Sequence, residues 1–121
     1  MTPEARLLAQ ALLDHHRQAC RSRINHDPDI DSCLISYGDL CERAGIPHLR
    51  TTAGKFLREI AEWCHENGWP PLNSLAVNGD TRKPGHGYNN APGCSLKNWR
   101  DQANACINFT DYPVVDSSDD H

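Results

Sequence analysis

Hydrophobic residues recur at helical spacing in four stretches of the chain. The first stretch runs from Pro3 to about Ile24, with Thr2 as its expected N-cap. The second opens at Ser36 or Tyr37 and ends at Gly45, because glycine readily adopts the left-handed conformation that closes a helix. These two patterns predict one long helix and one short helix.

The third and fourth stretches are also amphipathic. The third is capped by Thr51 or Thr52 and ends at Asn67 and Gly68, and its expected buried face is Ala53, Phe56, Leu57, Ile60, Ala61 and Cys64. The fourth is a last helix capped by Ser95, whose apolar face carries Leu96, Trp99, Ala103, Cys106 and Ile107. Both patterns place a helix against a common core.

Short apolar runs between these helices predict strands. The polar segment NHDPDIDS is expected to be a loop, and Cys33 to Ser36 a short edge strand after it. Leu72 to Val77 forms a second strand-like run, and the turn signal at residues 78–80 follows. A short returning arm over His86 to Tyr88 would complete a hairpin, which in this position is a wing.

Helix, turn, longer helix and hairpin is the chain order of a winged helix-turn-helix. The sequence therefore predicts a small α+β fold of this type, with helices added at the N- and C-terminal ends. At 121 residues one domain is expected, over residues 1–113. Residues 114–121 form an acidic tail that we expect to be disordered.

The composition predicts a cytoplasmic protein that does not enter the membrane. Mean hydropathy is −0.67, no apolar run approaches the roughly 20 residues of a membrane helix, and the N-terminus lacks a secretory signal pattern. Six cysteines are present, and their positions on apolar helix faces favour buried, reduced thiols. A zinc site assembled from distant residues is the alternative. No metal or cofactor is predicted.

Charge is distributed unevenly along the chain. Residues 43–58 and residues 81–100 together hold eight of the twelve basic residues and none of the sixteen acids. The remainder carries four basic residues against sixteen acids, a net charge of −12. In a winged helix these two windows face a duplex. The expected nucleic-acid-binding residues are Arg50, Thr52, Lys55, Arg58, Arg82, Lys83, Lys97 and Arg100. The plainer interpretation is that these are ordinary solvated side chains.

Enzymatic chemistry finds little support in the sequence. Cys94 is the best candidate for a nucleophilic thiol, because it precedes the last helix and could lie near His86. A loop cysteine beside a glycine is more often inert. No paired carboxylates, serine elbow or phosphate-binding loop is present, so we expect a protein that is not an enzyme and has no catalytic residues.

The segment ISYGDLCERAGIP, with Gly87 and Tyr88 further on, resembles the DNA-binding domain of alkylguanine-DNA alkyltransferases and alkyltransferase-like proteins. The resemblance covers about residues 35–88 and implies a winged-helix fold and a DNA-docking mode. It does not extend to alkyl transfer, because the Pro-Cys-His-Arg segment of that family is absent and Asn73 to Val77 stands in its place. The stretch from Gly68 to Tyr88 is also similar to small, uncharacterised bacterial and mobile-element proteins that carry an LVVNKDTGKPGEGF-like hairpin.

The sequence thus predicts a non-catalytic module that binds double-stranded DNA through its third helix and a basic wing. The alternative is a protein-binding inhibitor or adaptor, such as a phage or mobile-element anti-defence protein that acts on a nucleic-acid-binding host complex. In that role the acidic remainder would imitate nucleic acid. Neither hypothesis predicts an oligomeric state.

Overall fold

The computed structural model describes residues 1–21 and 30–113. Its longer helices are α1 (Pro3–Arg21), α4 (Ala53–Glu66) and α5 (Trp99–Asn108), and its shorter ones are α2 (Ile30–Cys33) and α3 (Tyr37–Arg43). Five short 3₁₀ or strand segments complete the core region: η1 (Pro47–Leu49), β1 (Ile35–Ser36), η2 (Leu72–Leu75), β2 (Ala76–Val77) and η3 (His86–Asn90), and a further turn, η4 (Leu96–Asn98), precedes α5. The expected helix end at Ile24 and the expected disordered tail at 114–121 lie outside the described residues.

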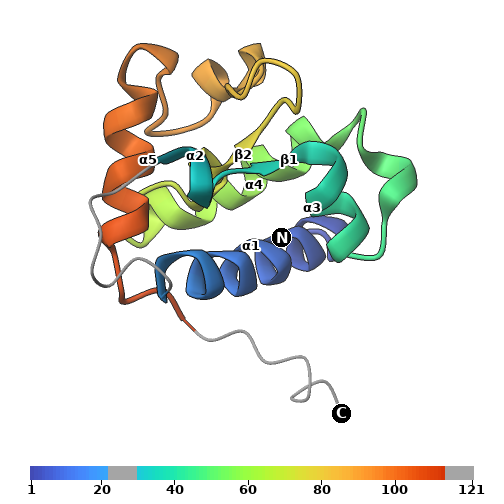
Figure 1. The fold of residues 1–121 in the computed structure, drawn as a ribbon, viewed down its shortest axis with the longest axis horizontal. Coiled ribbons are helices and arrows are strands. Elements are labelled where there is room, and N and C mark those ends of the chain that lie inside the picture. The colour runs from blue at the N-terminus through green and yellow to red at the C-terminus, as the bar shows by residue number, and fades with distance from the viewer. Residues whose placement is uncertain (22–29, 114–121) are drawn as a thin grey trace.

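The helices enclose a small parallel sheet. In Figure 1, α1 runs along one edge of the molecule, α5 stands at one end, and the two strands lie between them. Strand β1 pairs in parallel with β2, with Ile35 opposite Ala76 and Ser36 opposite Val77. α1 packs against α3, α4 and η2, while α5 packs against η2 and α2. The α+β class predicted from the sequence is confirmed.

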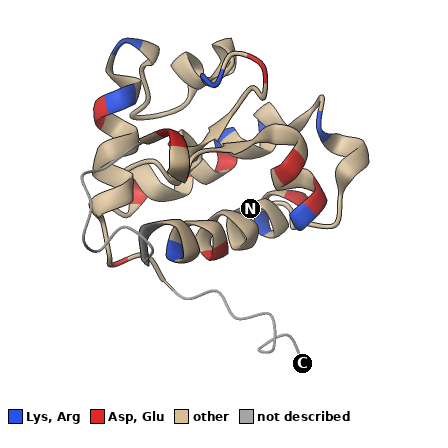
Figure 2. Cartoon of the chain, viewed as in Figure 1, with Lys and Arg blue, Asp and Glu red and all other residues tan. Residues whose placement is uncertain are grey.

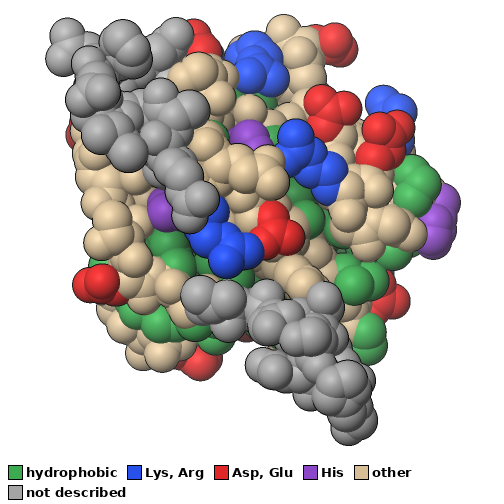
Figure 3. All heavy atoms as spheres, turned by 60° about the horizontal axis from the view of Figure 1, so that its bottom comes forward, with side chains coloured by type: hydrophobic (Ala, Val, Ile, Leu, Met, Phe, Trp, Pro, Cys, Tyr) green, Lys and Arg blue, Asp and Glu red, His purple; other side chains and the backbone are tan. Residues whose placement is uncertain are grey.

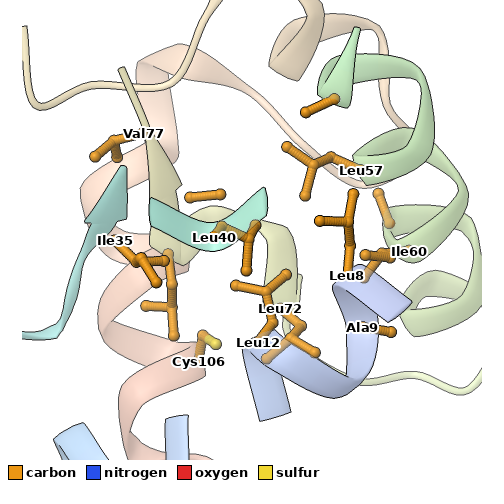
Figure 4. Close-up of a cluster of buried hydrophobic side chains, with 14 of the residues drawn as sticks. Leu8, Ala9, Leu12, Ile35, Leu40, Leu57, Ile60, Leu72, Val77 and Cys106 are labelled. Carbon is orange, nitrogen blue, oxygen red and sulfur yellow. The ribbon is translucent and has the colours of Figure 1, made fainter. Parts of the chain in front are cut away.

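The core is built from aliphatic residues contributed by almost every element. Figure 4 shows the side chains of α1 and α4 meeting those of α3, η2 and the strands. The largest of the fully buried aliphatic residues are Leu8, Leu12, Leu40, Ile60, Leu72, Leu75 and Val77. Burying such a side chain contributes about 1.5–3 kcal/mol, so the helices are held mainly by this shared core.

The predicted helix boundaries are largely confirmed. The N–H of Ala5 bonds the Thr2 hydroxyl at 3.2 Å, and the N–H of Asp39 bonds the Ser36 hydroxyl at 3.1 Å, so both residues act as N-caps. Gly45 has a φ of +80° at the end of α3. The six residues predicted as the inner face of α4 are all buried.

Two residues predicted as helix caps make no side-chain capping bond, although Thr52 does occupy the N-cap position of α4. Thr52 precedes α4, but its hydroxyl donates to the Leu49 carbonyl at 3.2 Å and makes no capping bond. Ser95 makes no side-chain capping bond either, and it is followed by η4, so that α5 begins only at Trp99. Local side-chain bonds of serine and threonine compete with capping, and propensity alone does not show which one forms.

The expected edge strand from Cys33 to Ser36 is shorter than predicted. Ile30–Cys33 forms the helical turn α2 inside a region expected to be loop or strand, and only Ile35 and Ser36 are extended. Similarly, the first four residues of the expected strand at 72–77 are the 3₁₀ turn η2, where the Ser74 hydroxyl donates to the Pro71 carbonyl at 2.6 Å. That bond favours a tight turn over an extended chain.

The antiparallel hairpin expected for a wing is not formed within the described residues. The arm predicted as a returning strand, His86 to Tyr88, is part of the 3₁₀ helix η3. The turn signal at 78–80 is confirmed, since the Asp80 N–H bonds the Asn78 Oδ1 at 2.8 Å. After this turn the chain moves away from β2, because the Gly85 N–H bonds the Tyr37 hydroxyl at 2.7 Å. β2 therefore pairs with β1.

Candidate functional site

A cleft of about 200 Å³ lies between the first half of α4 and the loop that follows β2. On one side are η1 and α4, and on the other is the glycine-rich segment from Gly85 to Ala91. Its lining residues are Tyr37, Arg50, Thr51, Gly54, Leu57, Arg58, Asn73, Ala76, Gly85, Gly87, Tyr88 and Ala91. The cleft brings together parts of the two acid-free windows, which are some 30 residues apart in the chain.

Two tyrosines fix the loop wall of the cleft. The Tyr37 hydroxyl accepts the Gly85 N–H at 2.7 Å, and the Tyr88 hydroxyl donates to the Oε1 of Gln102 on α5 at 2.5 Å. Burial raises the pKa of the Tyr37 and Tyr88 hydroxyls, so both rings are neutral near pH 7. The loop is thus held between α3 and α5 by uncharged hydrogen bonds.

Arg50 and Arg58 are the two cations of the cleft. Both are exposed, and Arg58 also faces Glu62 one turn along α4, with Nε to Oε1 at 3.8 Å. Arg50 lies over Gly38, where an added Cβ would come within 3.9 Å of the arginine Cζ. An exposed pair such as Arg58 and Glu62 contributes little to stability, so the Arg58 guanidinium can turn toward an anion. The exposed Arg50 guanidinium can do the same.

Two further residues near the start of α4 that were predicted to bind nucleic acid do not line the cleft. Thr52 and Lys55 are exposed, but the Thr52 hydroxyl is bonded to Leu49 and the Lys55 ammonium lies 5.0 Å from the ring centre of Phe56. Lys55 nevertheless lies next to the cleft residue Gly54 along α4. Thr52 offers no free donor there.

Arg82 makes a hydrogen bond within the protein. Its guanidinium donates to the backbone carbonyl of Asp31 at 3.1 Å, and its φ of +57° lies in the left-handed region. It ties the turn after β2 to α2. This bond occupies the guanidinium that was expected to contact a nucleic-acid backbone.

The remaining three cations border a second hollow. Lys83, Lys97 and Arg100 line it together with Leu96, Trp99 and Asp101. This hollow and the cleft lie on either side of the same loop. Lys83 and Pro84 border the second hollow, and the next residue, Gly85, borders the cleft. Apart from Thr52 and Arg82, the predicted residues thus form two basic groups on either side of a loop and no continuous stripe.

Charges of both signs are interleaved elsewhere on the molecule. Figure 2 shows acidic residues between the basic ones along the ribbon. On the face in Figure 3, acidic and basic side chains alternate with hydrophobic ones. A further hollow beside the cleft shares Arg50 but also contains Asp39, Glu42 and Asp80. An anionic partner is therefore best accommodated at the cleft and the second hollow.

Asn73 belongs to the site, although the sequence did not indicate it. It is 4% exposed and lines the cleft. Its Nδ2 donates to the Cys94 sulfur at 3.8 Å, while its Oδ1 has no hydrogen-bond partner among the described residues. A buried acceptor left without a donor costs about 1–3 kcal/mol, so this oxygen is suited to receive a donor from a ligand.

Cys94 is not the activated thiol that its position suggested. It is buried, and burial raises its pKa, which the hydrogen bonds with Asn73 and Tyr88 only partly offset. A raised pKa keeps the thiol protonated and unreactive at neutral pH. In residues 1–21 and 30–113 no three His, Cys, Asp or Glu side chains gather as a metal site.

No protein-family model, curated protein or solved structure matches this chain. Its function has to be inferred from the site. Within the described segments, no helix has the length and apolar character needed to cross a bilayer.

Proposed function

We propose that the protein is a non-catalytic module that binds double-stranded nucleic acid through the first half of α4 and the loop at residues 83–91. The observation that supports this most directly is the convergence of the two acid-free windows on one cleft. Arg50 and Arg58 come from the first window, and Gly85 and Gly87 from the second. Cations beside bare backbone are a surface to which a phosphate strand can approach closely.

The second hollow extends this surface along the other side of the loop. Lys83, Lys97 and Arg100 would contact the nucleic-acid backbone there, while Lys55 continues it along α4. A handful of phosphate contacts gives modest affinity that falls steeply with salt. The proposed contact surface resembles the helix-turn-helix mode in using α4, but it uses an irregular loop where a wing would have a hairpin.

The proposal is tested by fluorescence anisotropy of a labelled duplex of about 20 base pairs at about 50 mM and about 200 mM salt. We expect salt-sensitive binding by the wild type, and at least tenfold weaker binding by Arg50→Ala combined with Arg58→Ala. A second double variant, Lys97→Ala with Arg100→Ala, should weaken binding by a smaller factor and reduce the salt slope.

The matched control is Arg6→Ala with Arg17→Ala on α1, which removes the same charge from another face. Both residues are exposed. Equal losses in the control and the cleft variants would show that only net charge matters and would contradict the docking surface. No binding by the wild type at low salt would instead favour the protein-binding hypothesis, in which the partner belongs to a nucleic-acid-binding complex.

A further inference from the structure

The N-terminus of α4 opens into the cleft without a cap. Thr52 makes no capping bond, and within the described residues the N–H groups of Ala53 and Gly54 have no hydrogen-bond acceptor, whereas the N–H of Lys55 bonds the Thr52 carbonyl at 3.3 Å. The first turn contains no acidic residue. The positive end of a 14-residue helix is thus not neutralised by the protein itself.

Gly54 leaves this helix end accessible. A glycine inside a helix is about 0.5–1 kcal/mol less favourable than alanine. A Cβ at Gly54 would meet no atom within 4 Å, so packing within the protein does not require glycine here. Gly54 is exposed and lines the cleft. The missing side chain allows a ligand to reach the N–H of residue 54.

Asn73 provides an independent indication that the same cleft receives a ligand. Asn73 is 4% exposed. The nitrogen is directed to the Cys94 sulfur, and Cys94 does not line the cleft. The atom of this side chain that has no hydrogen-bond partner among the described residues is the acceptor oxygen, Oδ1. A ligand that satisfies it must carry an O–H or N–H donor as well as the group that binds the helix end.

We propose that the cleft binds one sugar-phosphate unit, with the phosphate on the N-terminus of α4. The Gly54 N–H, Arg50 and Arg58 would bind the phosphate oxygens, since helix N-termini and guanidinium groups are both suited to this anion. A sugar hydroxyl or an attached amine would donate to the Asn73 Oδ1. The volume of about 200 Å³ is below the roughly 300–1,000 Å³ of sites for drug-sized ligands, so it suits a single unit.

The sugar-phosphate unit can belong to a nucleic-acid strand. In that case the inference rests on the proposed function and identifies the group of the strand that the protein binds most tightly. A free sugar phosphate offers the same chemistry. The two sources are separated by comparing inorganic phosphate, ribose 5-phosphate and a duplex as probes.

The test uses two substitutions of the same residue in the full chain. Gly54→Pro removes the N–H but fits the first turn of a helix, where that N–H makes no intrahelical bond. Gly54→Ala keeps the N–H and adds one methyl group. We expect Gly54→Pro to weaken phosphate binding at least tenfold and Gly54→Ala to change it by less than about threefold, as measured by calorimetry. Equal affinities of the two variants would overturn the proposal.

Asn73→Leu tests the other end of the cleft. It should lower the affinity for ribose 5-phosphate to that for inorganic phosphate, and leave the latter within about threefold of wild type. An unchanged preference for ribose 5-phosphate would contradict the role of Oδ1. Circular dichroism and thermal melting check that each variant is folded.

If Gly54→Pro does not fold, the phosphate site is tested on the wild-type protein instead. The amide resonance of Gly54 should move on addition of phosphate and stay in place with chloride at the same ionic strength. An identical response to both salts would overturn the phosphate site.

The duplex separates this inference from the proposed function. Duplex binding that weakens in Gly54→Pro supports both. Duplex binding that is equal in Gly54→Pro and Gly54→Ala keeps the proposed function and overturns the placement of a nucleic-acid phosphate on the N-terminus of α4. Binding of ribose 5-phosphate without any duplex binding overturns the proposed function and supports a free sugar phosphate as the ligand.

Discussion

At the residue scale, His15 and His16 are neighbours in the sequence that are both buried against different parts of the fold. The Nε2 of His15 lies 2.8 Å from the Cys33 carbonyl, and the Nε2 of His16 lies 2.8 Å from the Cys106 carbonyl. Each ring therefore donates to a backbone oxygen. These two bonds connect α1 to α2 and to α5.

The same two histidines make stability depend on pH. Burial is the largest cause that lowers the pKa of His15 and of His16, and the hydrogen bonds to backbone carbonyls offset it in part. The folded protein thus favours the neutral rings, whereas the unfolded chain takes up protons near pH 6.5. We expect the urea midpoint to be constant above about pH 7 and to fall as the pH drops through 6.5 toward the lowered pKa values.

Gln at position 16 can keep the hydrogen bond to Cys106 but cannot titrate. His16→Gln should therefore reduce the fall in midpoint between about pH 7.5 and pH 5.5. His48→Gln, at an exposed position on η1, serves as the control and should leave it unchanged. A fall that is the same in all three proteins would show that other groups cause it.

At the scale of elements, glycines close the helices α3 and α4 and shape the loop before α5. Gly45 ends α3, Gly68 follows α4, and Gly93 lies in the loop, with φ values of +80°, +72° and +74°. A Cβ at Gly45 or Gly68 would meet no atom within 4 Å, but at Gly93 it would lie 2.8 Å from the Nδ1 of His65. The third glycine is thus required for both conformation and space.

Substitution of these glycines should separate the two requirements. Gly68→Ala should lower the free energy of unfolding by about 1–2 kcal/mol, the cost of a left-handed alanine. Gly93→Ala should lower it by about 1 kcal/mol more, because the methyl group displaces the His65 ring. Urea denaturation measures both.

A His65→Ala background provides the control, since it removes the ring that the methyl group meets. In that background Gly93→Ala should cost no more than Gly68→Ala. If the extra cost persists, the His65 contact is not its cause.

At the scale of the whole molecule, the interior holds several thiols that are protected from solvent. Cys33, Cys41, Cys64, Cys94 and Cys106 are all buried. Burial raises the pKa of Cys64 to about 11 and raises the pKa of Cys41 and Cys94 as well. The prediction that these five thiols are buried is confirmed. The side chain of Cys20 lies outside the described part of the chain.

This arrangement predicts slow thiol chemistry in the folded state. In a Cys20→Ser variant, labelling by a disulfide reagent at pH 7.5 should be at least about a hundredfold slower in buffer than in denaturant, because only opening of the fold exposes the thiolates. The melting temperature should be the same with and without a reducing agent. Rapid labelling of one equivalent in the native protein would identify an accessible, reactive cysteine and contradict the burial.

Part of the site could be predicted from sequence, because charge is a property of composition. The cations Arg50 and Arg58 were predicted, and they do line the cleft. Asn73 could not be found, since an asparagine in a strand-like run carries no signal that its side chain will be buried and left with a free oxygen. Arg82 looked like the neighbouring Lys83, and only the position of Asp31 distinguishes their roles.

The helices α3 and α4 could be predicted from the sequence alone, because apolar periodicity and a terminal glycine are local features that each stretch of chain carries within itself. The inner face of α4 and the ends of α3 and α4 follow from it. Tertiary structure decided the pairing of β1 with β2 and the path of the glycine-rich loop. Two strands of two residues each have little preference of their own. Their partner was set by the shared core and by the bond from Gly85 to Tyr37, and these contacts join residues that are far apart in the chain.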